Sequence, residues 1–178
     1  MKNYFKNDKI TLRALEPDDI ELLYSWENNE EIWNVSQTLA PFSKHILAIY
    51  IQNSDKDIYE SKQLRLMIDD SNNHTVGAID LFDFDPFNQR LGIGILIQKE
   101  ADRSQGFAKS ALALMIDYCF DKLKLHQVYA NIGETNVASI NLFSQVGFRL
   151  EGTKKDWLRV IDGWEDEHLY QLINTKFH

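Results

Sequence analysis

One short stretch of the chain combines the residue types best suited to chemistry. Leu91–Ile97 alternates like a strand and carries two glycines, and the loop Arg103-Ser104-Gln105-Gly106-Phe107-Ala108 then opens a helical pattern. Such a loop directs several backbone N–H groups outward at the positive end of a helix, which suits a diphosphate. Gly106 and Ala108 keep bulky side chains away, and Arg103 could add a charge-assisted contact. The other interpretation of this glycine is a plain turn.

A second motif follows one predicted strand later. It is Asn136-Val137-Ala138-Ser139-Ile140-Asn141-Leu142-Phe143, closed by Val146-Gly147-Phe148. Asn136 suits the N-cap of a helix, and Gly147 suits the position just after its end. The spacing of the two motifs is far more specific than either motif alone.

Hydrophobic periodicity predicts the elements that must position these motifs. Strands are expected at Ile10–Arg13, 64–68, Thr75–Phe84, 91–97 and Val128–Ile132, with a hairpin of Trp157–Ile161 and Glu165–Ile173 around Asp162-Gly163. Helices are expected from Pro17 to about Asn28, after Ser43, over 108–119 and over 136–146. This order predicts an α/β (α+β) protein with a mixed, mostly antiparallel central sheet and helices on both faces. The length of 178 residues fits one domain, 1–178.

The two motifs resemble those of the GNAT N-acetyltransferases. The family pattern Arg/Gln-x-x-Gly-x-Gly/Ala is matched by Arg103, Gly106 and Ala108, and its downstream pattern Asn-x-x-Ser/Ala with Gly-Phe is matched by Asn136, Ser139, Gly147 and Phe148. Gly77 fits the Val-Gly of the preceding strand. The resemblance extends from Thr11 to the hairpin. Within the family it points first to bacterial spermidine acetyltransferases and next to ribosomal-protein N-terminal acetyltransferases, and it implies the GNAT fold.

The resemblance implies acetyl-CoA as co-substrate and a layout for its site. The diphosphate would lie on Arg103, Ser104, Gln105, Gly106, Phe107 and Ala108, with Lys109 close behind. The pantetheine arm would pair with the backbone of Leu96, Ile97 and Gln98, where two strands splay apart, and Asn136 would bind the arm from the other side. A backbone N–H near Leu96 would face the thioester oxygen. Attack by an amine makes an oxyanion there, and a fixed donor stabilises it.

Phe143 is the clearest departure from the family pattern. The polyamine enzymes carry at this position a tyrosine that protonates the departing thiolate, and phenylalanine has no proton to give. Ser139 could supply the hydrogen bond, a water could do so, or the enzyme could be weak or inactive. Ser139 could instead bond back to its own helical turn, and Phe143 could be a core aromatic.

Asp80 is the candidate general base. Asp80 and Asp83 follow Gly77, where spermidine acetyltransferases carry acidic residues. Strict alternation places Asp80 on a face shared with apolar residues, namely Val76, Ala78, Phe82 and Phe84. A carboxylate on such a face must have a partner, face a cleft or be protonated, and a cleft would suit amine binding. Asp83 could equally be a solvated loop charge.

The end of the first predicted helix borders the acceptor site in the resemblance. Glu27, Glu30 and Glu31 could bind an amine there, or they could be ordinary acids on an exposed helix end. Trp26 and Trp33 could stack against the acceptor, or they could belong to the core. Asp166 and Glu167 of the hairpin are second-tier candidates that are also consistent with structural or rim charges.

Composition narrows the classes of partner. The net charge is −8, which argues against nucleic acid as a partner and favours a polycation, although acidity also serves solubility alone. The five histidines are scattered and Cys119 is the single cysteine, so no metal site and no disulfide are expected. No apolar run is long enough for a membrane span and the first residues show no secretory signal, so a cytoplasmic location is expected.

The sequence thus predicts an acetyl-CoA-dependent transfer to an amine by direct attack, without a covalent enzyme intermediate. A polyamine such as spermidine is the leading acceptor. The N-terminus of a ribosomal or other protein, or an antibiotic-like amine, is comparable. A non-catalytic acyl-CoA-binding module is the alternative from another class. A homo-oligomer is compatible with the resemblance.

Overall fold

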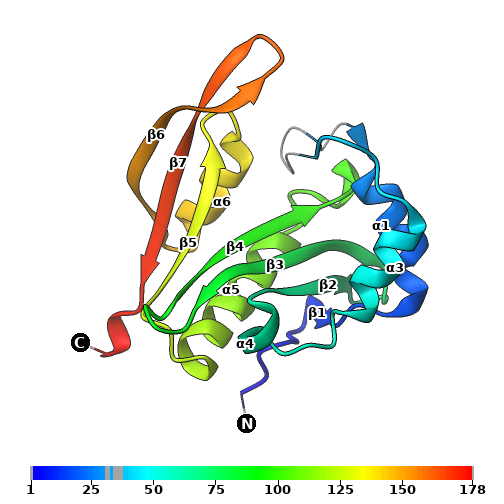
Figure 1. Cartoon of the computed structure of the whole chain (residues 1–178). Helices are drawn as coiled ribbons and strands as arrows, with labels where there is room; N and C mark the ends of the chain where they lie inside the picture. Colours follow the sequence, from blue (N-terminus) through cyan, green and yellow to red (C-terminus); the bar gives the residue numbers. More distant parts are fainter. Residues whose placement is uncertain (1, 31–32, 34–37, 178) are drawn as a thin grey trace.

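A seven-stranded sheet forms the centre of the computed structural model, which describes residues 2–30, 33 and 38–177. The strands are β1 (Ile10–Arg13), β2 (Leu64–Asp70), β3 (Thr75–Asp85), β4 (Arg90–Ile97), β5 (Gln127–Gly133), β6 (Arg149–Val160) and β7 (Gly163–Ile173), in the order β1-β2-β3-β4-β5-β7-β6 (Figure 1). Among the strands of the described residues, only β4 and β5 are parallel neighbours. The prediction of a mixed, mostly antiparallel sheet is confirmed.

Helices cover both faces of this sheet, as predicted. α1 (Ile20–Glu27) and α3 (Lys44–Gln52) pack on one face, and α5 (Phe107–Asp117) and α6 (Val137–Gln145) lie on the other (Figure 1). The shorter elements are α4 (Ile58–Ser61), 3-10 turns at Pro17–Asp19, Glu100–Asp102 and Thr175–Phe177, and a π-helical turn at Tyr118–Lys122. None of the helices among the described residues is long and apolar enough to cross a membrane.

α3, α4 and α6 begin at residues whose side chains satisfy free backbone donors. Ser43 accepts a hydrogen bond from the Ile46 N–H at 3.2 Å, Asp57 caps α4, and Asn136 accepts from the Ser139 N–H at 3.1 Å. Gly147 follows α6 with a φ of 100°, the left-handed conformation that favours glycine. The caps at Ser43 and Asn136 and the stop at Gly147 agree with the sequence prediction.

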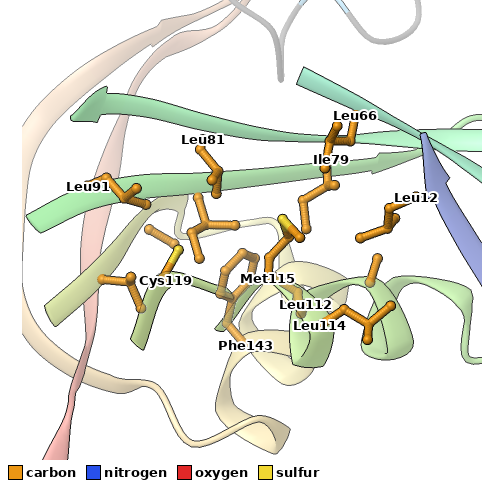
Figure 2. Packing of buried hydrophobic residues seen from close by; sticks show 14 of the residues in the cluster. Leu12, Leu66, Ile79, Leu81, Leu91, Leu112, Leu114, Met115, Cys119 and Phe143 are labelled. Carbon is orange, nitrogen blue, oxygen red and sulfur yellow. The ribbon is translucent and has the colours of Figure 1, made fainter. Parts of the chain in front are cut away.

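Alternating side chains divide the apolar core between the two faces. On the α5 face, Leu66, Ile79, Leu81 and Leu91 pack against α5, as Figure 2 shows. On the other face, Met67 packs with α1 and α3. β2 is therefore buried on both faces.

β6 begins at Arg149, earlier than the predicted start at Trp157. Residues 149–151 are exposed, so no apolar alternation marks the beginning of this strand. β6 pairs with β7 and forms an edge of the sheet.

β4 and β5 separate soon after they meet. They pair over Arg90–Gly92 and Gln127–Tyr129, and no later residue of β4 pairs with β5 in the described part of the chain. β5, β7 and β6 then diverge from β4 (Figure 1). The far end of β4 is consequently left with one unpaired backbone edge, and that end leads directly into the loop before α5.

Candidate active site

The loop before α5 has the backbone conformation of an anion-binding turn. Ser104 has a φ of 62° and Gly106 has a φ of 82°, and Gly106 is the N-cap of α5. Left-handed residues within such a turn make neighbouring N–H groups converge on one concavity. The Arg103 N–H bonds to the Glu100 carbonyl at 3.0 Å and so does not contribute.

The N–H groups that follow Arg103 are available for a ligand. Within residues 2–30, 33 and 38–177, no acceptor is found for those of Ser104, Gln105, Gly106, Phe107, Ala108 and Lys109. Backbone N–H groups rarely stay unpaired unless water or a ligand satisfies them. At the positive end of an eleven-residue helix, such a group of donors suits a diphosphate.

Two side chains of this loop are held by backbone carbonyl groups. Arg103 Nε lies 3.3 Å from the Ile97 carbonyl oxygen, and Gln105 Nε2 donates to the Ala101 carbonyl at 2.7 Å. The loop also receives a contact that the sequence did not predict, because Lys9 Nζ donates to the Gln105 carbonyl at 2.7 Å.

The backbone groups of every second residue of β4 point to its unpaired edge. The Gln98 N–H donates to the Val76 carbonyl on β3 at 3.0 Å, and the Gln89 carbonyl accepts from the His126 N–H on the β5 side. Because backbone groups alternate along a strand, Leu96 and Gln98 face β3, whereas Ile93, Ile95 and Ile97 face the splay. The predicted backbone roles of Leu96 and Gln98 are therefore wrong, and that of Ile97 agrees with the geometry.

Gln98 offers its side chain instead. Its Oε1 is buried and has no hydrogen-bond partner among the described residues. A buried acceptor without a donor is costly unless a ligand or water completes it. Gln98 directly follows β4 and precedes the loop before α5 in the chain, so its unpaired acceptor adds to the backbone donors of this region that a ligand would complete.

Asn136 and Ser139 lie at the start of α6, beyond the end of β5. The Oδ1 of Asn136 accepts from the Ser139 N–H, so its amide donors remain for a ligand. The Ser139 hydroxyl has no hydrogen bond to any residue that the structure describes, so the alternative of a bond back to its own turn is not observed. Both side chains retain the hydrogen-bonding capacity that the sequence interpretation requires.

Phe143 belongs to the core. It is 3% exposed and contacts Phe148 edge-to-face, with ring centroids 5.0 Å apart. Figure 2 shows its side chain among the buried apolar residues between α5 and the sheet. Of its two interpretations, the core aromatic is the one observed.

Asp80 has a partner that strict alternation did not reveal. Arg65 on β2 binds both carboxylate oxygens of Asp80, at 2.6 and 3.0 Å, and reaches Glu27 at 2.6 Å. Burial alone would lower the pKa of Arg65, but Asp80 and Glu27 outweigh burial and raise it. A carboxylate held in this fork is not free to act as a general base.

Two bulges explain why strict alternation predicts the wrong neighbours for Asp80 on its face of the sheet. The register of β3 shifts near Val76 and again between Phe82 and Asp85. Val76 and Phe84 consequently join the core on the α5 face, while Ala78 packs on the face of α1 and α3. Bulges reverse alternation and carry no strong signal in a single sequence.

Asp83 lies at the second bulge, exposed and with a φ of 52°. The Tyr129 hydroxyl lies 3.4 Å from its Oδ2. Burial first and Asp83 second raise the pKa of Tyr129, which keeps this phenol protonated. Asp83 thus has a partner on β5. It does not belong to the Arg65 cluster, which consists of Arg65, Asp80 and Glu27.

The predicted acceptor residues of α1 separate into different environments. Trp26 is 6% exposed and packs with α3, as the core interpretation predicts, and a contact with the acceptor stays a prediction. Glu27 contacts Arg65, and Glu30 is exposed. The Trp33 indole donates to the Glu27 carbonyl at 2.9 Å. Glu31 lies outside the described residues.

Gly92 serves packing on the acceptor side of β4. A Cβ at Gly92 would lie 2.2 Å from the Phe82 ring, so this glycine makes room for an aromatic side chain rather than for a ligand. Gly77 serves a close approach of β3 to β4, since its Cβ would lie 2.0 Å from the Leu96 carbonyl oxygen. Phe82 therefore covers β4 beside Asp80.

The remaining candidates are structural. Asp166 pairs with Lys155, and Glu167 pairs with Lys154 across β6 and β7. Burial raises the pKa of the Cys119 thiol, so it stays protonated and is no nucleophile. The described residues contain no group of potential metal ligands.

Comparison with known proteins identifies the family. Residues 9–149 match the acetyltransferase (GNAT) domain. The chain is 23% identical to spermidine N(1)-acetyltransferase of Vibrio cholerae, over 96% of each chain. It is 27% identical to YdaF, a ribosomal N-acetyltransferase homologue of Bacillus subtilis, over 96% of this chain and 94% of YdaF.

The fold agrees with solved structures. The crystal structure of the Vibrio cholerae enzyme in complex with CoA and spermine superposes with a TM-score of 0.85 at 22% identity and covers 96% of this chain and 98% of that one. The free donors of residues 104–109, the open edge of β4 and the unpaired Gln98 Oε1 fit a CoA thioester. The chain therefore belongs to the GNAT family and is an N-acetyltransferase that uses acetyl-CoA as its co-substrate.

Proposed function

We propose that the acceptor is a primary amine of a polyamine such as spermidine. The carrying observation is the Arg65 cluster beside the open edge of β4, where two carboxylates share one cation. Its net charge is negative, and the Glu27 Oε2 has no hydrogen-bond partner among the described residues. A second ammonium group of a polyamine would bind such a carboxylate. The overall charge of −8 supports attraction of a polycation, as does similarity to the Vibrio cholerae spermidine enzyme.

The co-substrate supplies an activated acetyl group, and the chain's own residues orient it. The N–H groups of residues 104–109 hold the diphosphate, and the Asn136 amide and Gln98 Oε1 hold the arm. The backbone N–H of Ile95 or Ile97 faces the thioester oxygen and stabilises the oxyanion that amine attack creates. The acceptor ammonium first loses a proton to water, and the free amine then forms the C–N bond as the C–S bond breaks. The Ser139 hydroxyl donates a hydrogen bond to the departing thiolate, and the remaining amine proton passes to solvent.

A protein N-terminus is the second candidate acceptor, favoured by the similarity to YdaF. A peptide N-terminus has a single ammonium group, so the two acceptors differ in their need for the Glu27 carboxylate. The alternative hypothesis is a non-catalytic acyl-CoA-binding module, which would bind CoA and release no thiol.

Release of free thiol across an amine panel separates these candidates. We expect turnover with spermidine and spermine to exceed that with peptides that begin with serine, alanine or methionine, and with aminoglycosides. Mass spectrometry of the product identifies the acetylated nitrogen. Turnover with a peptide and with no polyamine would contradict the polyamine proposal. CoA binding without thiol release from any amine would instead indicate the binding module.

A homo-oligomer is part of this proposal. The Vibrio cholerae spermidine N-acetyltransferase has a dodecameric structure. In this chain the β6–β7 hairpin exposes large apolar side chains, including Trp157 at 58%, Ile161 at 89% and Trp164 at 62%. Light scattering after size exclusion should give a mass above that of the 20.8 kDa chain.

A further inference from the structure

Lys9 lies against the loop before α5, although 96 residues separate it from Gln105. Its Nζ donates to the Gln105 carbonyl at 2.7 Å and lies 5.9 Å from the centroid of the Phe107 ring. A Cβ placed on Gly106 would lie 3.4 Å from this nitrogen. The ammonium group therefore interacts with Gln105 and Phe107 and lies close to Gly106 between them, and it has no carboxylate partner among the residues that the structure describes.

A tight turn presents Lys9 to the loop. The Asn7 side chain accepts hydrogen bonds from the N–H groups of Lys9 and Ile10, at 2.9 and 3.0 Å. The Asn7 N–H donates to the Ile10 carbonyl at 3.0 Å, and the Leu12 N–H donates to the Phe5 carbonyl at 2.7 Å. The turn and β1 thus fix the backbone of Lys9 rather than leaving it in a free terminus.

The contact determines the direction of one N–H group in the loop. The Gln105 carbonyl and the Gly106 N–H belong to the same peptide unit, and the two groups of a trans peptide point in opposite directions. Because Lys9 holds the carbonyl on one side, the Gly106 N–H points to the other side. That N–H has no acceptor in the described part of the chain.

Holding this carbonyl also removes a competing arrangement. The Gln105 carbonyl would otherwise be the acceptor for the Lys109 N–H if α5 were extended backward by one residue. The observed helix begins at Phe107, and the Lys109 N–H is not bonded to Gln105. The bond from Lys9 therefore favours the conformation in which both N–H groups remain available.

We infer that Lys9 is a positioning residue for the diphosphate of acetyl-CoA, because it orients the 105–106 peptide so that the Gly106 N–H faces the ligand. Lys9 acts from behind the loop, through the peptide, and its charge adds a favourable field at the site. This inference rests on the proposal that residues 104–109 hold the diphosphate. It makes the turn before β1 part of the co-substrate site, whereas the two motifs expected to bind acetyl-CoA lie at 103–108 and 136–148.

The test measures CoA binding by calorimetry in Lys9→Met, Lys9→Arg and Lys6→Met. Lys6→Met is the matched control, because Lys6 is exposed in the same segment and has no contact with the loop. Lys9→Met should weaken CoA binding about fivefold, as expected for one lost hydrogen bond. Lys9→Arg and Lys6→Met should bind CoA like the unaltered protein.

A donor without the diphosphate distinguishes positioning from general damage. The KM for S-acetylpantetheine should be unchanged in Lys9→Met, while the KM for acetyl-CoA rises and kcat stays constant. Unaltered CoA binding, or an equal rise in KM for both donors, would overturn the inference. If thermal unfolding shows that Lys9→Met does not fold, Lys9→Gln takes its place in the same comparison.

Gly106→Asp separates this inference from the site on which it rests. A carboxylate at this position should repel the diphosphate and abolish CoA binding. If Gly106→Asp binds CoA normally, the loop is not the diphosphate site and the proposed layout fails. If Gly106→Asp loses CoA while Lys9→Met keeps it, the layout stands and the role of Lys9 is rejected.

Discussion

At the scale of single residues, Phe143 stands where the resemblance implies an acidic tyrosine, and Ser139 carries the hydroxyl proposed to assist the leaving thiolate. Phe143 is buried against Phe148 and cannot exchange protons. Ser139 has a free hydroxyl at the start of α6, beside the Asn136 cap. Thiolate is a fair leaving group, so a hydrogen bond from a serine is sufficient assistance where a full proton transfer is not required.

Ser139→Ala should therefore lower kcat by roughly tenfold, less than the usual loss for a general acid. The KM for acetyl-CoA should stay constant, because the hydroxyl contributes only as the thiolate departs. Steady-state kinetics with spermidine provides the measurement. Ser144→Ala is the control, since Ser144 is exposed on the same helix. An unchanged kcat in Ser139→Ala would assign the proton to water.

At the scale of elements, Arg65 connects three parts of the fold. It extends from β2 to Asp80 on β3 and to Glu27 at the end of α1, and its guanidinium lies 5.6 Å from the Tyr50 ring of α3. These contacts hold the layer of α1 and α3 against the sheet beside the acceptor side of β4. The acidic residues of this cluster thus connect elements of the fold as well as offering negative charge to a ligand.

Arg65→Met should destabilise the protein by about 2 kcal/mol, because it leaves two partly buried carboxylates without their cation. The double variant Arg65→Met with Asp80→Asn should recover part of this loss, since a neutral amide tolerates burial better than an unpaired charge. Urea unfolding of both variants gives the two free energies. Equal stability of the single and double variants would show that the charge of Asp80 does not carry the effect.

At the scale of the whole molecule, local sequence patterns predicted the helices and strands, but they did not predict contacts between residues that are far apart in the sequence. The caps at Ser43 and Asn136 and the loop before α5 are written in neighbouring residues, so they could be predicted, and the family resemblance placed the co-substrate. The pairing of Arg65 with Asp80 and of Lys9 with Gln105 depends on which strands become neighbours. The arrangement of residues 1–178 as one domain stays a prediction.

The sequence pattern alone also did not predict which face of the sheet each side chain of a strand occupies. The bulges of β3 moved Val76 and Phe84 to the opposite side from Asp80, and a bulge follows from pairing geometry rather than from composition. Which backbone groups of β4 face the splay likewise depends on the β3 register, so the sequence points to Leu96 although the backbone groups of Ile95 and Ile97 face the splay. An error of one residue reverses every assignment along a strand.

Residues near the two ends of the described chain form ion pairs with one carboxylate, that of Asp121. The contribution of these ion pairs to the stability of the fold depends on pH. Asp121 accepts hydrogen bonds from Lys2 at 2.5 Å and from Lys176 at 2.9 Å. These two ammonium groups, Lys2 first, lower the pKa of Asp121 from 3.8 to about 2. A carboxylate whose pKa is lower in the folded state stabilises the fold above its unfolded pKa, and that contribution is lost as pH falls toward the folded pKa.

Asp121→Asn should therefore lower the melting temperature by a few degrees at pH 6, and the difference from the unaltered protein should shrink as pH falls from about 4 toward 2. Salt should shrink it too, because the lysines are exposed and exposed pairs are screened. Asp55→Asn is the control, since Asp55 is exposed and forms no ion pair with any residue that the structure describes. Scanning calorimetry between pH 6 and pH 3 would decide the matter, and a pH-independent difference would show that Asp121 stabilises by packing alone.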